Sequence, residues 1–452
     1  MLYKVKKERL FTNQQLLALL WPLIIEQALG VLVGMADTVM VSSVGEAAIS
    51  GVSLVDMINQ LIITVFGALA TGGAVVTSQH LGAKRPEEAA RSAGQLVGLS
   101  GILGTAVAVF CLVTRTAQLR LFFGTISEDV MQACLTYFTI TALSFPFLAL
   151  YNAGAAIFRS TGNSAVSMKV SVLVNAINFC GNALCVFVLR MGVAGVAVPT
   201  LVSRAVGAVI ILSLAAKRDY VLRITPRTVT RLEGRTVRSI LYIGIPSAFE
   251  NSLFQLGRVL VVSMISLFGT VHISANAVAN NLDAVGCIVG NAMGLAMITV
   301  VGRCVGAQDF EQTKHYTKKL LLWDYIAQGT VNLLVLLFLN RILGMYTLSP
   351  ETRALSWTLV MIHDGVAILL WPAGFVLPNA LRAANDVRFT MVTSILSMIV
   401  WRMGLSWILC VNMGMGAVGV WLAMVVDWIC RVTCFVIRFA SGAWQKSAMK
   451  KV

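Results

Sequence analysis

The sequence has little charge and no long polar segments. Only 12% of its 452 residues are charged, whereas soluble domains average about 25%. Hydrophobic residues make up 58% of the chain, and no stretch between the apolar runs could hold a soluble domain of ordinary size. This composition excludes an ordinary soluble protein. It predicts an all-α protein that crosses a membrane many times.

Motifs of common enzymes and motors are missing as well. There is no GxxxxGK(S/T) phosphate loop, so we expect no ATP motor in this chain. Neither HExxH nor GxSxG occurs, and the four histidines are scattered. We therefore expect a protein that is not an enzyme, has no catalytic residues and needs no cofactor. Any uphill transport must then draw on an ion gradient.

Nine cysteines are present, but none of them form a CxxC pair. Nearly all lie inside predicted apolar helices, where cysteine is a small packing residue. The cysteines therefore predict neither disulfides nor a metal site.

Twelve apolar runs are long enough to cross a bilayer, which takes about 20 residues. We predict helices at 14–40, 49–79, 92–114, 128–158, 166–189, 193–216, 236–268, 272–302, 317–341, 350–381, 389–412 and 416–440.

Positive charge is distributed unevenly between the loops. With the N-terminus in the cytoplasm, 26 of the 35 Lys and Arg residues fall in cytoplasmic tails and loops, and five fall on the other side. The net charge of +15 therefore indicates membrane topology rather than a nucleic-acid partner. We expect both termini to be cytoplasmic and the chain to lie in the cell (inner or plasma) membrane, with the lipid bilayer as its surroundings.

The first half of the chain repeats in the second half at an offset of 224 residues. Fourteen of the 66 positions in 22–87 are identical to their partners. Among these pairs are Pro22 and Pro246, Glu26 and Glu250, Met40 and Met264, Gly45 and Gly269, and Gly82 and Gly306. Many transporters are built from such repeats, with a site between the two halves. We predict an N-lobe (1–216), a cytoplasmic linker (217–238) and a C-lobe (239–452). Each lobe has six helices, so a pseudo-twofold axis should run along the membrane normal.

Two carboxylates lie within the first predicted helix. Glu26 and Asp37 are eleven residues apart, about three helical turns, and so lie on nearly one face. A charge inside a bilayer is costly, which makes both residues functional candidates. A carboxylate in a cavity can bind a proton, attract a cationic substrate, or ligate Na⁺ with neighbouring oxygens. Glu26 and Glu250 occupy equivalent positions, so they are either cavity residues or a symmetric structural pair.

Asparagines form a stripe on the fifth predicted helix. Asn175, Asn178 and Asn182 are spaced by three and four residues and share a face. Asparagine is unfavourable in helix interiors. The stripe therefore predicts either a polar cavity or a network between helices.

The second half carries further candidates for a substrate cavity. Asn280 and Asp283 share a stripe on the eighth predicted helix. Gln255 on the seventh and Asp364 on the tenth are the other candidates. Arg258 is expected to neutralise Glu250 or an acid of the eighth helix. Since only Arg258 and Arg402 lie deep in the membrane, we expect a cavity that is not cationic.

Five prolines fall within predicted helices and should bend them or free backbone carbonyls. They are Pro22, Pro146, Pro199, Pro246 and Pro372.

Several segments resemble the multidrug and toxic compound extrusion (MATE) family over essentially the whole chain. The most specific is MADTVMVSSVG at 35–45. Other matching segments are SQHLGAKRPEEAAR (78–91), FRSTGNS (158–164), NFCGNA (178–183), GVAGVA (192–197), IGIPSAFE (243–250), VGRCVGAQ (301–308) and LRAAND (381–386). The resemblance implies twelve helices in two six-helix lobes arranged as a V. It also implies export of organic cations or other amphiphilic compounds in exchange for Na⁺ or H⁺.

The resemblance also carries over to single residues. Asp37 falls on the family's first-helix acid, which is implicated in cation coupling. Asn178 and Asn182 fall where some members have an Asn and an Asp. The resemblance therefore implies coupling through Asp37, with a possible Na⁺ there. Another branch of the family has acids in its seventh and tenth helices, but here those levels hold Phe254 and Trp371.

We interpret the chain as a monomeric, cation-coupled antiporter that expels small amphiphilic or cationic molecules by alternating access, driven by Na⁺ or H⁺. The alternative is a flippase for lipid-linked oligosaccharide or lipid, from the wider superfamily.

Overall fold

Residues 9–124, 126–217 and 220–449 are described by a computed structural model, and within these ranges the regular elements are all helices. The first half contains α1 (Asn13–Ser42), α2 (Glu46–Gly82), α3 (Pro86–Phe123), α4 (Glu128–Leu143), α5 (Phe145–Ser160), α6 (Ser164–Ala183) and α7 (Ala194–Ala215). The short helix α8 (Pro226–Thr230) lies in the expected linker.

The second half contains α9 (Gly234–Ser266), α10 (Thr270–Gly286), α11 (Ile288–Gly306), α12 (Phe310–Gly344), α13 (Pro350–Trp371), α14 (Leu377–Ala383), α15 (Val387–Ser397), α16 (Gly416–Ala440) and α17 (Trp444–Ala448). Wider π-helical turns extend some of these helices: η1 (Leu184–Val188), η2 (Pro372–Val376), η3 (Met398–Leu405) and η4 (Trp407–Asn412).

All twelve segments predicted to span the membrane are helical, although several contain breaks. In the described ranges, ten helices are long and apolar enough to cross a membrane, and the bent pair α4 and α5 makes eleven. Helix α9 is also long enough at 33 residues. It falls outside this count because polar residues, including Glu250, Asn251 and Arg258, interrupt its apolar sequence.

The structure repeats with the same offset as the sequence. Helices α1 and α9 end at Ser42 and Ser266, which are 224 positions apart. Helix α2 spans Glu46–Gly82, and its partner in the second half runs from Thr270 to Gly306 as α10 and α11. The two halves are therefore copies of one helical arrangement, and the second copy has an additional break at Cys287.

Two of the five prolines mark clear irregularities. Pro146 is in the first turn of α5, directly after the 44° bend between α4 and α5. Pro372 begins the π-helical turn η2 after α13. Proline has no amide hydrogen to donate to the carbonyl four residues earlier, so the hydrogen bonding of the preceding helix cannot continue unbroken through it, and the chain bends or widens there. Pro22, Pro199 and Pro246 lie inside continuous helices.

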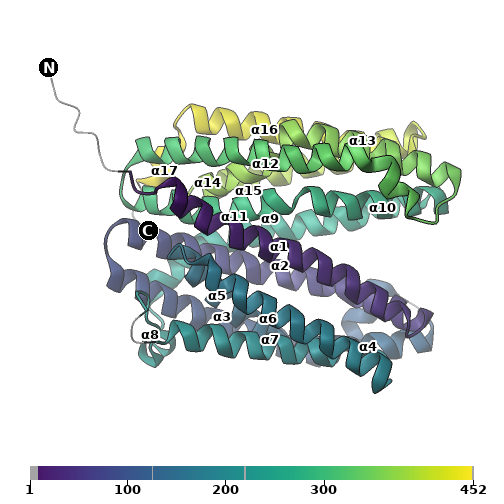
Figure 1. The fold of residues 1–452 in the computed structure, drawn as a ribbon, viewed down its shortest axis with the longest axis horizontal. Coiled ribbons are helices and arrows are strands. Elements are labelled where there is room, and N and C mark those ends of the chain that lie inside the picture. The colour runs from purple at the N-terminus through teal and green to yellow at the C-terminus, as the bar shows by residue number, and fades with distance from the viewer. Residues whose placement is uncertain (1–8, 125, 218–219, 450–452) are drawn as a thin grey trace.

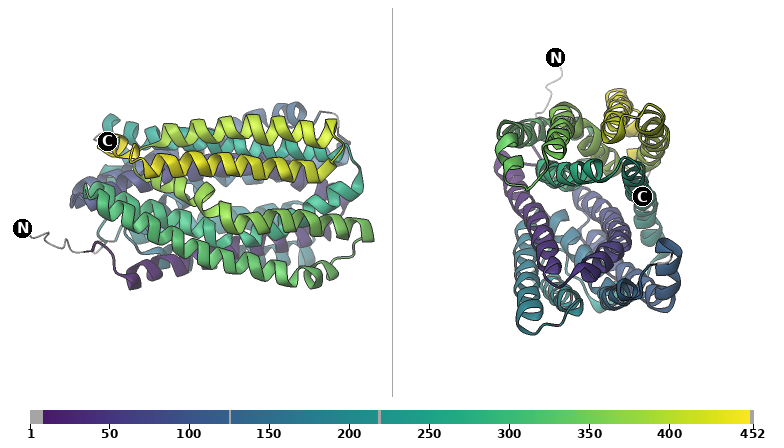
Figure 2. Two further views of the ribbon diagram at one scale, coloured as in Figure 1. Left: turned by 90° about the horizontal axis from the view of Figure 1, so that it is seen from above. Right: turned by 90° about the vertical axis from the view of Figure 1, so that its right-hand side faces the viewer.

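The two halves form separate lobes, with α3 to α7 in one and α12 to α16 in the other (Figure 1). The lobes converge at the end that carries α8 and α17, and they diverge toward the end that carries α4 and α10, so the molecule is V-shaped. Figure 2 shows from two further directions that the helices of both lobes run along one long axis. The starts of α1 and α17 lie at the same, convergent end.

The expected linker is fixed to the N-lobe through Gln95, which is 1% exposed. The Gln95 amide nitrogen donates to the carbonyl oxygen of Thr228 at 2.9 Å, and the Gln95 amide oxygen accepts from the backbone of Glu233 at 2.8 Å. Helix α9 already begins at Gly234, so the last residues of the segment expected to be linker are helical.

Candidate functional site

In the N-lobe, Asp37 meets the asparagine stripe. The Asn182 amide nitrogen donates to the Asp37 carboxylate at 2.8 Å and to the Asn178 amide oxygen at 3.3 Å. The Asn178 amide nitrogen in turn donates to the Thr200 hydroxyl at 3.0 Å. This chain of polar groups joins α1, α6 and α7. Asn182 is fully buried, whereas Asp37 is half-buried.

The structure therefore brings together the three residues that the sequence proposed for cation coupling. The third asparagine, Asn175, bonds instead to Ser171 on its own helix at 3.2 Å. Thr200, on α7, was not among the predicted residues. Its participation depends on how α6 and α7 pack, and no local pattern in the sequence indicates it.

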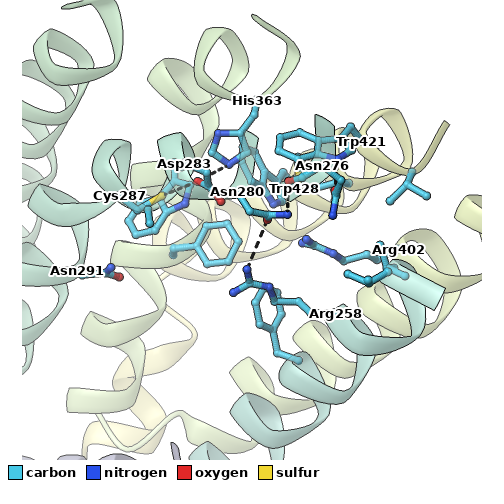
Figure 3. A pocket seen from close by; sticks show the side chains of 18 of the residues that line it. Arg258, Asn276, Asn280, Asp283, Cys287, Asn291, His363, Arg402, Trp421 and Trp428 are labelled. Atoms are coloured by element: carbon cyan, nitrogen blue, oxygen red, sulfur yellow. Dashed lines mark hydrogen bonds and ion pairs between the residues drawn. The ribbon is translucent and has the colours of Figure 1, made fainter. Parts of the chain in front are cut away.

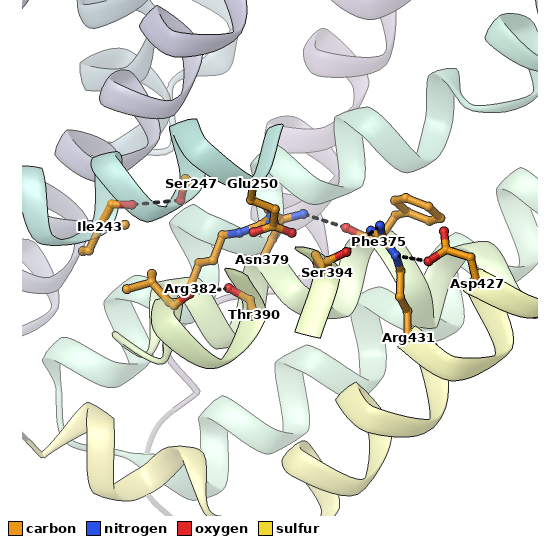
Figure 4. Close-up of polar contacts among 11 residues, drawn as sticks. Ile243, Ser247, Glu250, Phe375, Asn379, Arg382, Thr390, Ser394, Asp427 and Arg431 are labelled. Carbon is orange, nitrogen blue, oxygen red and sulfur yellow. Dashed lines mark hydrogen bonds and ion pairs between the residues drawn. The ribbon is translucent and has the colours of Figure 1, made fainter. Parts of the chain in front are cut away.

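Unlike Asp37, which contacts an amide, Glu26 and Glu250 each pair with an arginine. Glu26 pairs with Arg159 at 3.3 Å and accepts from the Ser167 hydroxyl at 3.0 Å. Glu250 pairs with Arg382 at 2.7 Å (Figure 4). In both lobes a helix-borne glutamate is thus neutralised by an arginine from a short helix, α5 or α14. This arrangement fits the structural alternative for these two acids.

The C-lobe contains two adjoining cavities. The larger, of about 370 Å³, is lined by Asn276, Asn280 and Asp283, together with Arg258 and Arg402. The smaller, of about 280 Å³, includes Glu250, Arg382 and Arg431 in its lining. Phe254, Asn291, Trp371 and Phe375 line both cavities. Val31 of α1 and Thr71 of α2 complete the linings, so both cavities face the N-lobe.

His363 joins two carboxylates at the wall of the larger cavity. Its Nε2 lies 2.8 Å from an Asp283 oxygen (Figure 3). Its Nδ1 lies 2.7 Å from an Asp364 oxygen. Asp283 also accepts from the Cys287 thiol at 3.0 Å. Single ligand atoms of Asp283, Cys287 and His363 lie within 4.8 Å of one another, close enough to hold a metal ion. In this structure, however, both ring nitrogens of His363 are engaged by carboxylates.

Only some of the residues predicted to line a substrate cavity in the C-lobe do so. Asn280 and Asp283 line the larger cavity, and Glu250 lines the smaller one. Gln255 is half-buried and belongs to neither cavity lining. Asp364 is only 1% exposed and lies behind His363, so the prediction that it is itself a cavity residue is wrong. His363 was missed because its role depends on two helices meeting.

The arginines also depart from expectation. Glu250 is neutralised by Arg382 rather than by Arg258, whose guanidinium donates to the Asn280 amide oxygen at 3.4 Å. Arg382 and Arg431 join Arg258 and Arg402 in lining the cavities. The expectation of a cavity that is not cationic is therefore wrong. Arg382 directly follows the tenth predicted helix and Arg431 lies within the twelfth, and the packing of the helices directs both toward the smaller cavity.

A buried polar row runs along α12 beside this site. Asp324, Gln328 and Asn332 are spaced by four residues, and each is at most 1% exposed. Among the residues that the structure describes, none of the three side chains has a hydrogen-bond partner. Asn332 approaches Gly286 and Gln328 approaches Gly290, where a Cβ atom would lie 2.3 Å and 2.1 Å from the respective amide oxygens. The spacing of four residues is a signal that the sequence does contain.

Comparisons with known sequences and structures all point to one family. The sequence model of the MatE family matches residues 22–184 and again 246–408, one match in each half. An uncharacterized transporter, YisQ of Bacillus subtilis, is 27% identical over 96% of this chain and 95% of its own length. A probable multidrug resistance protein, NorM of Thermotoga maritima, is 25% identical over 99% of this chain and 96% of its own length.

Solved structures show the same fold. An outward-facing multidrug resistance MATE family transporter superposes with a TM-score of 0.89 at 20% identity, covering 96% of both chains. A MOP superfamily transporter from Pyrococcus furiosus, reported with reverse polarity of its binding pocket, gives a TM-score of 0.88 at 22% identity and covers 97% of both chains. With family matches in both halves, a two-lobed helical fold and relatives aligned over their full length, this multi-pass membrane protein belongs to the MATE family of multidrug transporters.

Proposed function

We propose that the chain is a secondary active exporter, an antiporter that expels amphiphilic or cationic compounds by alternating access in exchange for Na⁺ or H⁺. The observation that carries this proposal is the contact of Asp37 with Asn182 and, through it, with Asn178 and Thr200. Neutral amides leave the negative charge of Asp37 uncompensated. The carboxylate can therefore exchange a proton or a sodium ion, which an arginine partner would prevent.

The topology belongs to the same proposal. The starts of α1 and α17 lie at the convergent end, and α8 of the arginine-rich linker lies there too (Figure 1). Together with the positive-inside asymmetry, this shared position supports a cell-membrane protein with both termini on the cytoplasmic side and the divergent end outside. A cysteine introduced at Arg227 should not react with an impermeant reagent added to intact cells. Ready labelling there would reverse the orientation.

The test uses purified protein in liposomes that contain a fluorescent organic cation. An imposed Na⁺ or pH gradient should drive the dye against its concentration difference. Asp37→Asn should lower this rate to that of protein-free liposomes, since it removes the exchangeable charge at nearly constant volume. Asp129→Asn, at the exposed start of α4, is the matched control and should export at the wild-type rate. An Asp37→Asn variant that exports normally would show that coupling occurs elsewhere.

A lipid flippase is the second candidate, because Arg258 and Arg402 line the larger cavity. Anionic lipid headgroups suit such a lining. Translocation of a fluorescent phosphatidylglycerol in the same liposomes distinguishes the two functions. A flippase would move the lipid without an imposed gradient, whereas an antiporter would leave it in place.

A further inference from the structure

Arg258 and Arg402 are positively charged groups whose neutralisation is incomplete. No carboxylate among the described residues lies within 4.0 Å of Arg258, whose polar partner is Asn280. The Nη1 atom of Arg402 is 3.9 Å from an Asp427 oxygen. That aspartate is already bonded to Arg431 at 2.9 Å and to the Ser397 hydroxyl at 2.6 Å.

Two other pairs of charges near the cavities are matched. Glu250 and Arg382 form one close pair, and Asp427 and Arg431 form another (Figure 4). On the opposite wall Asp283 and Asp364 share the single imidazole of His363, at 2.8 Å and 2.7 Å, so at most one of these two carboxylates is matched there. The two incompletely neutralised guanidinium groups, Arg258 and Arg402, point into the same space (Figure 3).

We propose that Arg258 and Arg402 form a subsite for the anionic group of a transported molecule, such as a carboxylate, sulfonate or phosphate. This inference rests on the proposed export function and specifies the substrate class for the C-lobe. Two guanidinium groups that face one cavity repel each other, and an anion between them relieves that repulsion. The planar guanidinium also presents paired donors that match a carboxylate or phosphate.

The aromatic side chains that line the larger cavity indicate the chemistry of the rest of the substrate. Trp371 and Phe375 stack at 5.0 Å between ring centroids, and Trp428 meets Phe375 edge-on at 5.6 Å. The ring of Phe254 lies 5.0 Å below the Arg402 guanidinium. Aromatic walls bind flat apolar groups, and the cavity of about 370 Å³ accommodates a compact polycyclic body.

These features select an aromatic amphiphile with an anionic end. A simple organic cation in the same position would place its charge against two guanidinium groups. Asp283 lines the same cavity with its side chain 24% exposed, so a zwitterion with a second, cationic end also fits. A neutral analogue of the same shape would keep the aromatic contacts but lose the interaction with the arginines.

The test compares 1-pyrenebutyrate with its neutral amide, which has the same size and shape. Binding to the full-length protein in phosphatidylcholine nanodiscs is measured by titration calorimetry, with no ion gradient. Wild type should bind the carboxylate at least about tenfold more tightly than the amide. Arg258→Gln together with Arg402→Gln should remove this preference and leave amide binding within about twofold of wild type. Arg258→Lys with Arg402→Lys should keep most of the preference, because the charge is retained.

Arg341→Gln is the matched control, since Arg341 lies near the end of α12 and outside both cavity linings. It should keep the full preference for the carboxylate. Equal affinity of wild type for the two compounds overturns the inference, as does a preference that survives the double glutamine variant. Should the glutamine variant fail to fold, the lysine variant decides the matter, because a loss of preference there would contradict a charge-based site.

A second set of nanodiscs identifies the source of the anion. If a lipid phosphate occupies the subsite, replacing phosphatidylcholine by phosphatidylglycerol should weaken 1-pyrenebutyrate binding to wild type but not to the double glutamine variant. If the subsite serves a free substrate, the two lipids should give the same affinity. Either result is consistent with an anion subsite formed by Arg258 and Arg402. Because no gradient is used, gradient-driven export can fail while this binding result stands, and the reverse also holds.

Discussion

At the scale of single residues, the partner of each membrane-embedded acid separates the proposed coupling site from the structural ion pairs. Asp37 is held by the neutral amide of Asn182, so its charge can be exchanged. Glu250 is held by Arg382, and Glu26 by Arg159, so each of these charges is fixed in a pair. An acid with an amide partner is therefore the better place for a transported ion.

The pair of Glu250 and Arg382 should stabilise the fold rather than couple transport. Both side chains are nearly buried, at 9% and 12% exposed. Glu250→Gln alone leaves the Arg382 charge unmatched and should destabilise the protein by about 3–5 kcal/mol. The double variant Glu250→Gln with Arg382→Gln should lose much less, because neither charge remains. Thermal unfolding of the three variants in detergent measures this difference. Equal losses in the single and double variants would contradict a structural pair.

The sequence predicted contacts along a helix better than contacts between helices. The spacing of Asn178 and Asn182 placed them on one face, and the structure has them bonded to each other. Arg382 and His363 were not predicted as partners, because Arg382 reaches Glu250 and His363 reaches Asp283 across a helix interface. Helix periodicity determines the face of a side chain, whereas the identity of its partner depends on how separate helices pack.

At the scale of elements, the repeat shows where the two lobes have diverged. Helix α2 is continuous, but its equivalent is divided into α10 and α11. The break lies between Gly286 and Gly290, against which Asn332 and Gln328 of α12 pack closely. The second lobe has thus gained a polar row beside the Asp283 and His363 cluster. The repeat predicted the common helices, but neither the break nor this row followed from it.

The buried polar row on α12 (Asp324, Gln328 and Asn332) should lower the free energy of unfolding of the protein and contribute to transport. Asp324 is 0% exposed, and both its carboxylate oxygens are unpartnered among the described residues. Asp324→Asn has nearly the same volume and removes the cost of the buried acid, so it should stabilise the protein by about 1–3 kcal/mol. The same change should slow export, because a costly buried group is retained where it serves a function. Thermal unfolding and the liposome assay together measure both effects. A variant with unchanged stability and unchanged export would show that the row is inert packing.

At the scale of the whole molecule, the convergent end is closed by contacts that repeat across the pseudo-twofold axis. The Gln79 amide of α2 donates to the Ala383 carbonyl of the C-lobe at 2.8 Å. Its equivalent, Arg303 of α11, donates to the Ser160 carbonyl of the N-lobe at 2.8 Å. Both lobes thus use the same position to hold the other. The proposed alternating access requires that both contacts break when the convergent end opens.

Glycines allow the two helices to approach this closely. A Cβ atom at Gly82 would lie 2.0 Å from the Arg303 carbonyl oxygen, and one at Gly306 would lie 1.9 Å from that of Gln79. Each glycine therefore meets the backbone of the other lobe, and a backbone cannot move aside as a flexible side chain does. Any larger residue must separate the lobes at this end.

Gly82→Ala and Gly306→Ala should each shift the protein toward a state that is open at the convergent end. A clash that costs about 2 kcal/mol changes the ratio of closed to open molecules about 30-fold. Spin labels at Arg227 and His315, one on each lobe, should report longer distances in these variants once the exposed Cys180 and Cys434 are replaced. Gly67→Ala is the control, because a Cβ atom there meets nothing within 4 Å on the same helix α2. Unchanged distances in both alanine variants would mean that the lobes part elsewhere. A matching change in the control would point to α2 itself rather than to the contact between the lobes.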